Sequence, residues 1–338
     1  MTPQVETGGV GIDGSLETVA GLIRENRKFL LTTHEGPDGD ALGSLLGTQQ
    51  MLTSLGKDSA MFLAAKEFPL PIEYRHLPLE DVFHEPPADL RDRVVIFLDC
   101  GNIDRMPVDF LRDGGRTVVN IDHHHDNTRF GDVNLVDSGA SSTSEIIYWL
   151  AVELDVRISP AMARALYIGI ITDTGKFMYD STDARTHEVV AALMRAGVDI
   201  DDVNRRLYES VPIEKVRLLS RALAKVELHC DGRLVTTCIT AEDYEISGAG
   251  EEMTEGIIDH LRAIDGVCAA AVIKDQVSRG KAARKVSLRA GDDSTDVSAI
   301  ARRFGGGGHV RAAGCSTELE FDQIVTEICS ALTEQAES

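Results

Sequence analysis

The chain has 338 residues, enough for two globular domains, and its hydrophobic fraction of 43% is ordinary for a folded protein. A formal net charge of −21 argues against a protein that binds long duplex nucleic acid through a basic surface. No apolar run reaches the roughly 18 residues that a membrane helix needs, and the amino terminus lacks the pattern of a secretory signal. We therefore expect a cytoplasmic protein with no membrane partner.

The first half of the chain predicts a parallel α/β sheet. Its first fifteen residues are rich in glycine and threonine and indicate a loose terminus. Three runs of apolar and β-branched residues then predict strands: KFLLTTH (28–34), RVVIFLD (93–99) and RTVVNIDH (116–123). Helical patterns lie at 41–56 and near Ser142 and Pro160. This alternation is typical of a parallel sheet with helices on both faces.

The second half predicts a smaller α/β domain with its own core. A charged helical pattern covers 184–225. Strand-like runs follow at 233–240, 269–277 and 284–290, and helical patterns lie at 252–263 and 321–333. We expect three segments along the chain: a first domain at 15–197, a helical connector at 198–225 and a second domain at 226–336.

The cysteines predict reduced, mostly buried thiols. Six of them are scattered along the chain, and none forms a CxxC pair. This distribution suits a reducing compartment and argues against a disulfide framework or a zinc knuckle.

Acidic and imidazole side chains gather where the three predicted strands of the first half end. His34, Asp38 and Asp40 follow the first strand, Asp99 ends the second, and Asp122, His123 and His124 end the third. Asp173, at the end of an apolar helix, is a further candidate. A single aspartate at a strand end is usually a turn or a helix cap, and a lone histidine usually packs in the structure.

The joint pattern predicts metal ions at this edge. The carboxyl ends of parallel strands meet at one edge of a sheet, so these side chains should converge there. Without a counter-charge they would repel one another and would be costly to desolvate. Carboxylate and imidazole ligands without thiolate favour manganese, and leave magnesium, iron and cobalt open. The ligands outnumber the needs of one ion, which predicts two divalent ions about 3.5–4 Å apart.

Several motifs resemble those of a known family. HEGPDGDALGS (34–44), DCGNIDR (99–105), DHHHDN (122–127) and GIITDTGKF (169–177) resemble the four motifs of the DHH phosphoesterase superfamily. FGGGGHVRAAG (304–314) resembles the signature of the DHH-associated carboxy-terminal domain. By size and plan the chain is most similar to the nanoRNase type, a bifunctional oligoribonuclease and 3'-phosphoadenosine-5'-phosphate phosphatase. Some relatives of that type cleave cyclic dinucleotides.

The resemblance implies a role for each residue of the gathered edge. One ion would be bound by His34 and Asp38, the other by Asp40, His123 and Asp173, and Asp99 would bridge them. Asp122 would support the histidines, a common way of fixing the tautomer of a ligating imidazole. His124 would face the substrate phosphate, so His124 and Asp99 are the catalytic candidates. Arg105 could contact a phosphate or form a salt bridge with a neighbouring acid, and His125 is interpreted as a turn residue.

The glycine run in the second half predicts a nucleotide-binding segment. It is not a Walker loop, because no Lys-Ser/Thr pair follows. Gly306, Gly307 and Gly308 would let the backbone approach a ligand, with His309 and Arg289 as the strongest side-chain candidates. Residues 274–311 carry nine lysines or arginines against four aspartates. One expected hydroxyl is absent, because Ala290 replaces the serine that commonly follows the strand arginine in the family.

Together the residues and the resemblance predict a manganese-dependent phosphoesterase that acts on very short RNA and on 3'-phosphoadenosine-5'-phosphate. Aromatic residues make up only 5% of the chain, which favours short single strands over long ones as substrate. A cyclic or linear dinucleotide phosphodiesterase is the nearest alternative. Three other functions fit less well: an inorganic pyrophosphatase, a RecJ-type exonuclease and a non-catalytic nucleotide sensor. A sensor should lack a metal ligand, whereas all six are present here. The sequence leaves open whether the chain forms a homodimer.

Overall fold

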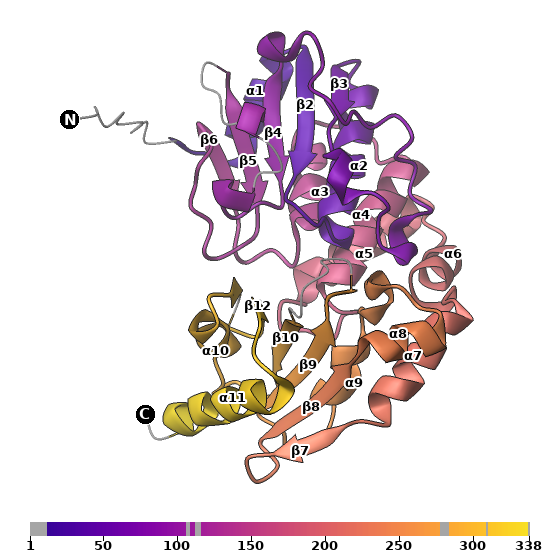
Figure 1. Ribbon diagram of the computed structural model, residues 1–338. Coiled ribbons are helices and arrows are strands. Elements are labelled where there is room, and N and C mark those ends of the chain that lie inside the picture. Colours follow the sequence, from indigo (N-terminus) through magenta and orange to yellow (C-terminus); the bar gives the residue numbers. More distant parts are fainter. Residues whose placement is uncertain (1–11, 106–108, 112–115, 278–283, 309, 337–338) are drawn as a thin grey trace, which may run out of the picture. The chain divides into compact units, whose positions relative to one another are not determined.

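A computed structural model describes residues 12–105, 109–111, 116–277, 284–308 and 310–336. The chain divides into two compact units, Met1–Glu209 and Ser210–Ser338 (Figure 1). The division lies inside the stretch for which the sequence predicts a connector. Among the described residues, no helix has the length and apolar composition required to cross a membrane.

The first unit is built on a six-stranded sheet in the order β1-β6-β5-β4-β2-β3, and every pair of neighbours is parallel. The strands are β1 (Ile12–Asp13), β2 (Lys28–Thr33), β3 (Asp58–Met61), β4 (Val94–Leu98), β5 (Val118–Asp122) and β6 (Val133–Val136). The three strands predicted from the sequence are β2, β4 and β5, which lie side by side in the centre. Their apolar runs are continuous because both faces of the sheet are covered.

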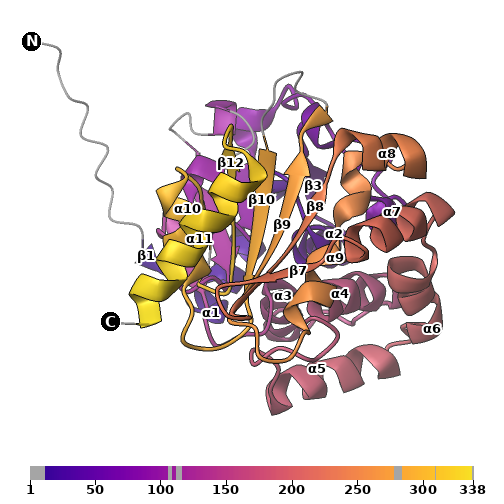
Figure 2. The same cartoon turned by 60° about the horizontal axis from the view of Figure 1, so that its bottom comes forward.

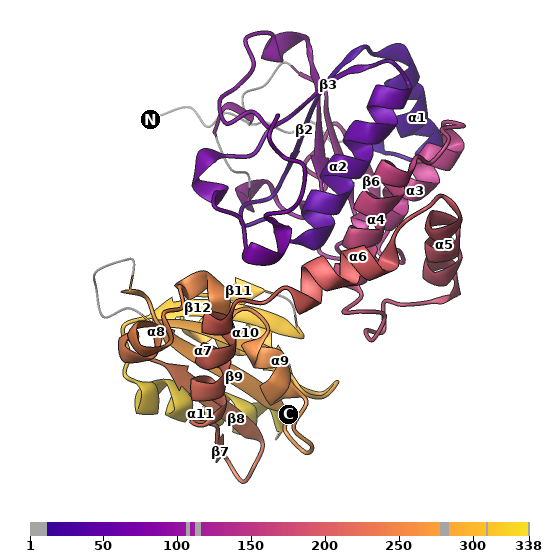
Figure 3. The same cartoon turned by 90° about the vertical axis from the view of Figure 1, so that its right-hand side faces the viewer.

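α-Helices cover one face of this sheet and short 3₁₀ helices contribute to the other, which confirms the predicted α/β fold class. The α-helices share one hydrophobic core on one face (Figure 3): α1 (Leu16–Glu25), α2 (Gly39–Ser54), α3 (Thr143–Glu153), α4 (Pro160–Asp173), α5 (Ala184–Arg195) and α6 (Ile200–Asn204). Phe29 and Leu31 of β2 point into that core, whereas Leu30 packs on the opposite face.

The opposite face is covered by short 3₁₀ helices and loops, because the chain returns there from β3 to β4 and from β4 to β5. Leu90 and Leu111 contribute to the core on this face. The short elements of the unit are η1 (Ala65–Glu67), η2 (Ile72–Tyr74), η3 (Leu90–Asp92), η4 (Ile103–Arg105), η5 (Asp109–Leu111) and the π-helical turn η6 (Arg205–Glu209).

The expectation of a loose amino terminus is wrong for residues 12–15. β1 pairs with β6, and the Ser15 side chain accepts a hydrogen bond from the backbone N–H of Thr18 at the start of α1. Two-residue strands carry too little periodicity to be recognised in a sequence. Residues 1–11 lie outside the described part of the chain.

Helices α2 and α4 approach closely because glycines line their contact. Gly39, Gly43 and Gly47 recur every fourth residue on α2 and so lie on one face of the helix. A Cβ atom at Gly43 would lie 2.6 Å from the carbonyl oxygen of Ala165 in α4. A Cβ atom at Gly169 of α4 would lie 1.9 Å from the Ser144 hydroxyl of α3. The three helices therefore meet at distances that only glycine allows.

The second unit has a mixed six-stranded sheet in the order β11-β12-β10-β9-β8-β7, in which only β8 and β9 are parallel neighbours within the described residues. The strands are β7 (Glu227–His229), β8 (Leu234–Ile239), β9 (Ala269–Asp275), β10 (Arg284–Ala290), β11 (Gly307–Gly308) and β12 (Ala312–Thr317). This is the smaller α/β unit that the sequence predicts.

Helices also cover both faces of the second sheet (Figure 2). α10 (Val297–Arg303) and α11 (Phe321–Ala336) form a core with one face. α7 (Ile213–Leu223), α8 (Ala241–Ser247) and α9 (Ile257–Arg262), with the short η7 (Glu251–Thr254), belong to the other face.

The prediction that all cysteines are reduced is wrong for one pair. Cys230, in the turn between β7 and β8, forms a disulfide with Cys329 of α11, and their Cα atoms are 5.8 Å apart. The two residues are 99 positions apart in sequence, so only the folding of α11 onto the sheet brings them together. The remaining four cysteines, Cys100, Cys238, Cys268 and Cys315, are free thiols.

Candidate metal centre

The carboxyl ends of the three central strands of the first unit bring the predicted side chains together. Because β5, β4 and β2 are neighbours, the segments that follow them emerge at one edge of the sheet. Three overlapping groups there have ligand atoms within 4.8 Å of one another: Asp99, His123 and His124; His34, Asp38 and Asp99; and Asp40, His123 and Asp173. Every residue for which the sequence predicts metal binding belongs to at least one group.

Asp99 lies at the centre of these groups. Its Oδ2 atom is 3.6 Å from His34 Nε2, and its Oδ1 atom is 3.6 Å from His123 Nε2. The two oxygens of one carboxylate thus face two different imidazoles. Asp99 also has φ of 57°, in the left-handed region that aspartate tolerates better than most residues. This turn at the end of β4 directs a carboxylate that is only 2% exposed into the site.

Asp40 and Asp173 are the two acids of this edge whose pKa values are raised, so their ionised forms are disfavoured. Burial, together with the carboxylates of Asp99 and Asp173, raises the pKa of Asp40 well above its ordinary value. Burial also raises the pKa of Asp173 to about 7, although His123, whose Nε2 is 3.3 Å from Asp173 Oδ2, acts in the opposite direction. A divalent cation among these groups would reverse the effect and hold both carboxylates ionised. The donor set fits a hard or borderline cation.

His34 and Asp38 lie on the turn between β2 and α2. His34 Nδ1 is 2.8 Å from the carbonyl oxygen of Glu35, which directs Nε2 towards Asp99. Asp38 is the N-cap of α2, and its Oδ1 accepts hydrogen bonds from the backbone N–H groups of Asp40 and Ala41. Arg105 contacts this turn, with Nη2 2.8 Å from His34 Nδ1.

His124 is held by the acid that precedes the two histidines. Its Nδ1 lies 2.7 Å from Oδ1 of the fully buried Asp122. Burial alone lowers the pKa of His124, but the Asp122 and Asp99 carboxylates outweigh it and raise the pKa to about 9. His125, the third histidine of the run, lies in an exposed turn.

The glycine run of the second unit is part of the sheet. Gly307 and Gly308 form β11 and pair with Gly314 and Ala313 of β12. A Cβ atom at Gly306 would lie 2.3 Å from the Gly314 carbonyl oxygen, and one at Gly308 would lie 2.6 Å from the Ala312 carbonyl oxygen. Close strand packing is therefore one reason for these two glycines, whereas Gly307 has open space beside it.

Arg289 lies on β10, two strands from the glycine run. It pairs with Ala312 of β12, and its Nη1 donates to the carbonyl oxygen of Leu288. Leu288 and Ala290 point into the core under α10 and α11, so Arg289 lies on the other face of the sheet. His309 is outside the described residues.

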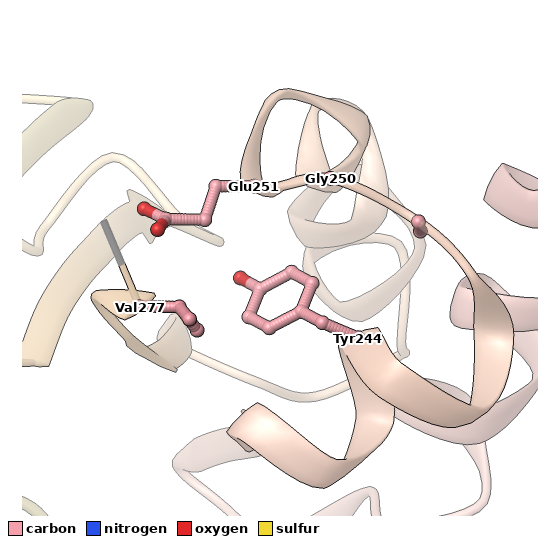
Figure 4. A pocket seen from close by; sticks show the side chains of 5 residues that line it. Tyr244, Gly250, Glu251 and Val277 are labelled. Carbon is pink, nitrogen blue, oxygen red and sulfur yellow. The ribbon is translucent and has the colours of Figure 1, made fainter.

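A separate cavity of about 300 Å³ lies elsewhere in the second unit (Figure 4). It is lined by Tyr244, Ala249, Gly250, Glu251 and Val277, and the Tyr244 hydroxyl points between Glu251 and Val277. None of these five residues belongs to the predicted site.

The comparisons with known proteins agree with this geometry. Residues 28–170 match the DHH family, N-terminal domain, and residues 239–336 match the DHHA1 domain. The chain is 31% identical over 310 residues to a bifunctional oligoribonuclease and PAP phosphatase NrnA of Thermus thermophilus, covering 90% of this chain and 89% of that protein. The chain belongs to the DHH family.

One further relative and one solved structure extend the comparison. A probable NrnA of Streptococcus mutans is 28% identical, covering 90% of this chain and 94% of that protein. The crystal structure of an exopolyphosphatase-related protein from Bacteroides fragilis superposes with a TM-score of 0.83 at 24% identity, covering 94% and 95% of the two chains. That likeness confirms the fold. In this DHH-family chain the triplet that names the family is Asp122, His123 and His124.

Two residues that the sequence does not single out contact the predicted ligands. Thr143 and Ser144 open helix α3, and their backbone N–H groups donate to the Asp40 carboxylate. The Thr143 hydroxyl donates to Asp99. Their sequence signal is the SSTSE stretch, which by itself indicates only a helix start with Ser142 as the cap.

Proposed function

We propose that this DHH-family chain is a manganese-dependent phosphoesterase that degrades very short oligoribonucleotides to mononucleotides and dephosphorylates 3'-phosphoadenosine-5'-phosphate. The observation that carries the proposal is the gathering of carboxylates and imidazoles around Asp99, in a chain that matches NrnA proteins along about 90% of its length. The names of those relatives supply the two substrate classes.

The side chains of the centre would divide the metal binding between them. Two divalent ions, when bound, supply positive charge that activates water and stabilises the reacting phosphate. The ligands of one ion would be His34 and Asp38, those of the other Asp40, His123 and Asp173, and Asp99 would bridge. The orientation of Asp99 supports this division, because its two oxygens face His34 and His123.

His124 and Arg105 would act on the substrate rather than on the ions. The Asp122 carboxylate occupies Nδ1 of His124 and holds the ring in place. His124 would then offset the negative charge that develops on the phosphate during attack. Arg105, which contacts His34, would bind a phosphate oxygen.

The second unit would hold the rest of the nucleotide. Arg289, the open backbone at Gly307 and the glycines beside it, and His309 would bind the part of the substrate beyond the scissile phosphate. Such contacts would favour chains of a few nucleotides, because their binding energy positions the reacting phosphate.

One assay tests the proposal. The purified full chain with Mn²⁺ is incubated with oligoribonucleotides of two to ten residues, 3'-phosphoadenosine-5'-phosphate, cyclic dinucleotides and pyrophosphate, and products are separated by chromatography. We expect mononucleotides from the shortest RNAs and inorganic phosphate from 3'-phosphoadenosine-5'-phosphate. A clear preference for cyclic dinucleotides or pyrophosphate would replace the proposal with that activity. Binding without turnover of any substrate would favour a sensor.

A further inference from the structure

We propose that Thr143 is a positioning residue of the metal centre, which orients both Asp40 and Asp99 for their ions. The inference rests on the proposed function, because it assigns a role relative to ions that the proposal places there. Thr143 is completely buried, so its contacts are with the protein interior.

The first contact orients Asp40. The Thr143 N–H donates to Asp40 Oδ2 at 2.6 Å, and the Ser144 N–H donates to Asp40 Oδ1 at 2.9 Å. The first N–H groups of a helix have no partner within the helix, and the positive end of the helix dipole favours a carboxylate there. The first two N–H groups of α3 therefore donate hydrogen bonds to both carboxylate oxygens of Asp40 in α2.

The second contact orients Asp99. The terminal torsion of an aspartate is broad, so packing alone does not decide which oxygen faces which neighbour. The Thr143 hydroxyl donates to Asp99 Oδ1 at 3.1 Å, and this is the oxygen that faces His123. The other oxygen is thereby directed to His34.

Through these two contacts, Thr143 touches ligands of both proposed ions. Asp40 belongs to one ion and Asp99 to both, so a change at Thr143 should disturb metal affinity before it disturbs the fold. Residues that orient metal ligands typically change metal affinity about 10–100-fold when they are replaced.

Thr143→Val tests the hydroxyl, because valine keeps the shape of the side chain. Thr143→Ser restores the hydroxyl. Thr143→Pro also removes the N–H, at the first position of a helix, where proline is tolerated. Thr186→Val is the matched control: Thr186 is equally buried, and its hydroxyl donates to the Glu145 carboxylate in the same unit, not to a proposed metal ligand.

The readouts are Mn²⁺ dissociation constants by isothermal titration calorimetry and thermal unfolding in the presence of a chelator. We expect Thr143→Val to weaken Mn²⁺ binding about 10–100-fold, Thr143→Pro to weaken it more, and Thr143→Ser and Thr186→Val to stay within about threefold of the wild type. Wild-type affinity in Thr143→Val, or an equal loss in Thr186→Val, would overturn the inference. A wild-type chain that binds no Mn²⁺ would instead overturn the proposed function.

Discussion

The Nδ1 atom of His124 lies 2.7 Å from Oδ1 of Asp122, a carboxylate with no exposed surface. This contact occupies one ring nitrogen and fixes the ring, which is compatible with the role on substrate that we propose for His124. We predict that His124→Ala lowers the turnover of 3'-phosphoadenosine-5'-phosphate by about two to four orders of magnitude and leaves Mn²⁺ content near that of the wild type. Steady-state kinetics and elemental analysis of one preparation give both quantities.

Asp99→Asn should behave differently. Asparagine tolerates the left-handed backbone at this position but carries no negative charge. Both Mn²⁺ content and turnover should therefore fall. If His124→Ala emptied the centre and Asp99→Asn did not, the roles proposed for these two residues would have to be exchanged.

Removal of metal should abolish activity. The proposed ligands are carboxylates and imidazoles, which favour hard and borderline ions. After dialysis against a chelator we expect no measurable hydrolysis, and Mn²⁺ should restore more activity than Zn²⁺. Full activity in a preparation that elemental analysis shows to be metal-free would contradict a metal-dependent mechanism.

The sequence was sufficient for the parts of the structure that depend on local pattern. The runs that end at His34, Asp99 and His123 are central strands because they are continuously apolar. Their convergence follows from the rule that parallel strands end at one edge. The fold class and the grouping of acids and histidines could therefore be predicted together.

Other features depend on residues that meet only after folding. Cys230 and Cys329 are 99 positions apart, and no spacing rule connects them. Thr143 looks like an ordinary residue at a helix start until α3 is placed against Asp40. In the sequence the glycine run predicts a ligand-binding segment, whereas in the structure Gly306 and Gly308 are also required by the close approach of β12. A local sequence pattern cannot distinguish glycines needed for ligand binding from glycines needed for close strand packing.

The contact between α2 and α4 gives a prediction about stability. In Gly43→Ala the new methyl group would lie 2.6 Å from the Ala165 carbonyl oxygen and 2.7 Å from the backbone nitrogen of Gly169. Backbone atoms cannot rotate away, so the helices must separate, at a cost of about 1–3 kcal/mol. Because Asp40 and Asp173 lie on these two helices, Mn²⁺ affinity should also fall.

Gly21→Ala is the matched control for Gly43→Ala. Gly21 lies inside α1, and a Cβ atom there would meet nothing within 4 Å. The substitution should stabilise the protein by about 0.5–1 kcal/mol, because alanine is the better helix former. Urea unfolding of both variants measures the two effects, and equal effects would show that the helix contact is not tight.

The lowered pKa of Asp243 leads to a prediction of how the stability of the second unit depends on pH. Burial alone raises the pKa of Asp243, but hydrogen bonds from Lys225, Thr240 and Arg221 outweigh it and lower the pKa to about 2. The ionised form is therefore favoured in the folded state, by about 2 kcal/mol. This contribution should be complete above about pH 4 and should disappear as the pH falls through 2. Asp243→Asn should show a deficit in urea unfolding that is constant from pH 5 to 7 and shrinks in acid. A deficit independent of pH would exclude this explanation.

Replacement of Arg289 tests whether the second unit selects the length of the substrate. If it holds the nucleotide beyond the scissile phosphate, Arg289→Ala should severely impair hydrolysis of dinucleotides and trinucleotides, because their binding energy no longer positions the phosphate. Bis-p-nitrophenyl phosphate offers that unit little to bind, so its hydrolysis should suffer much less, with Mn²⁺ content unchanged. Lys285→Ala is the control: Lys285 lies on the same face of β10, about 13 Å along the strand, and its loss removes the same charge. Equal losses on both substrates, or an equal effect of Lys285→Ala, would mean that Arg289 contributes only to folding or to the general charge of the unit.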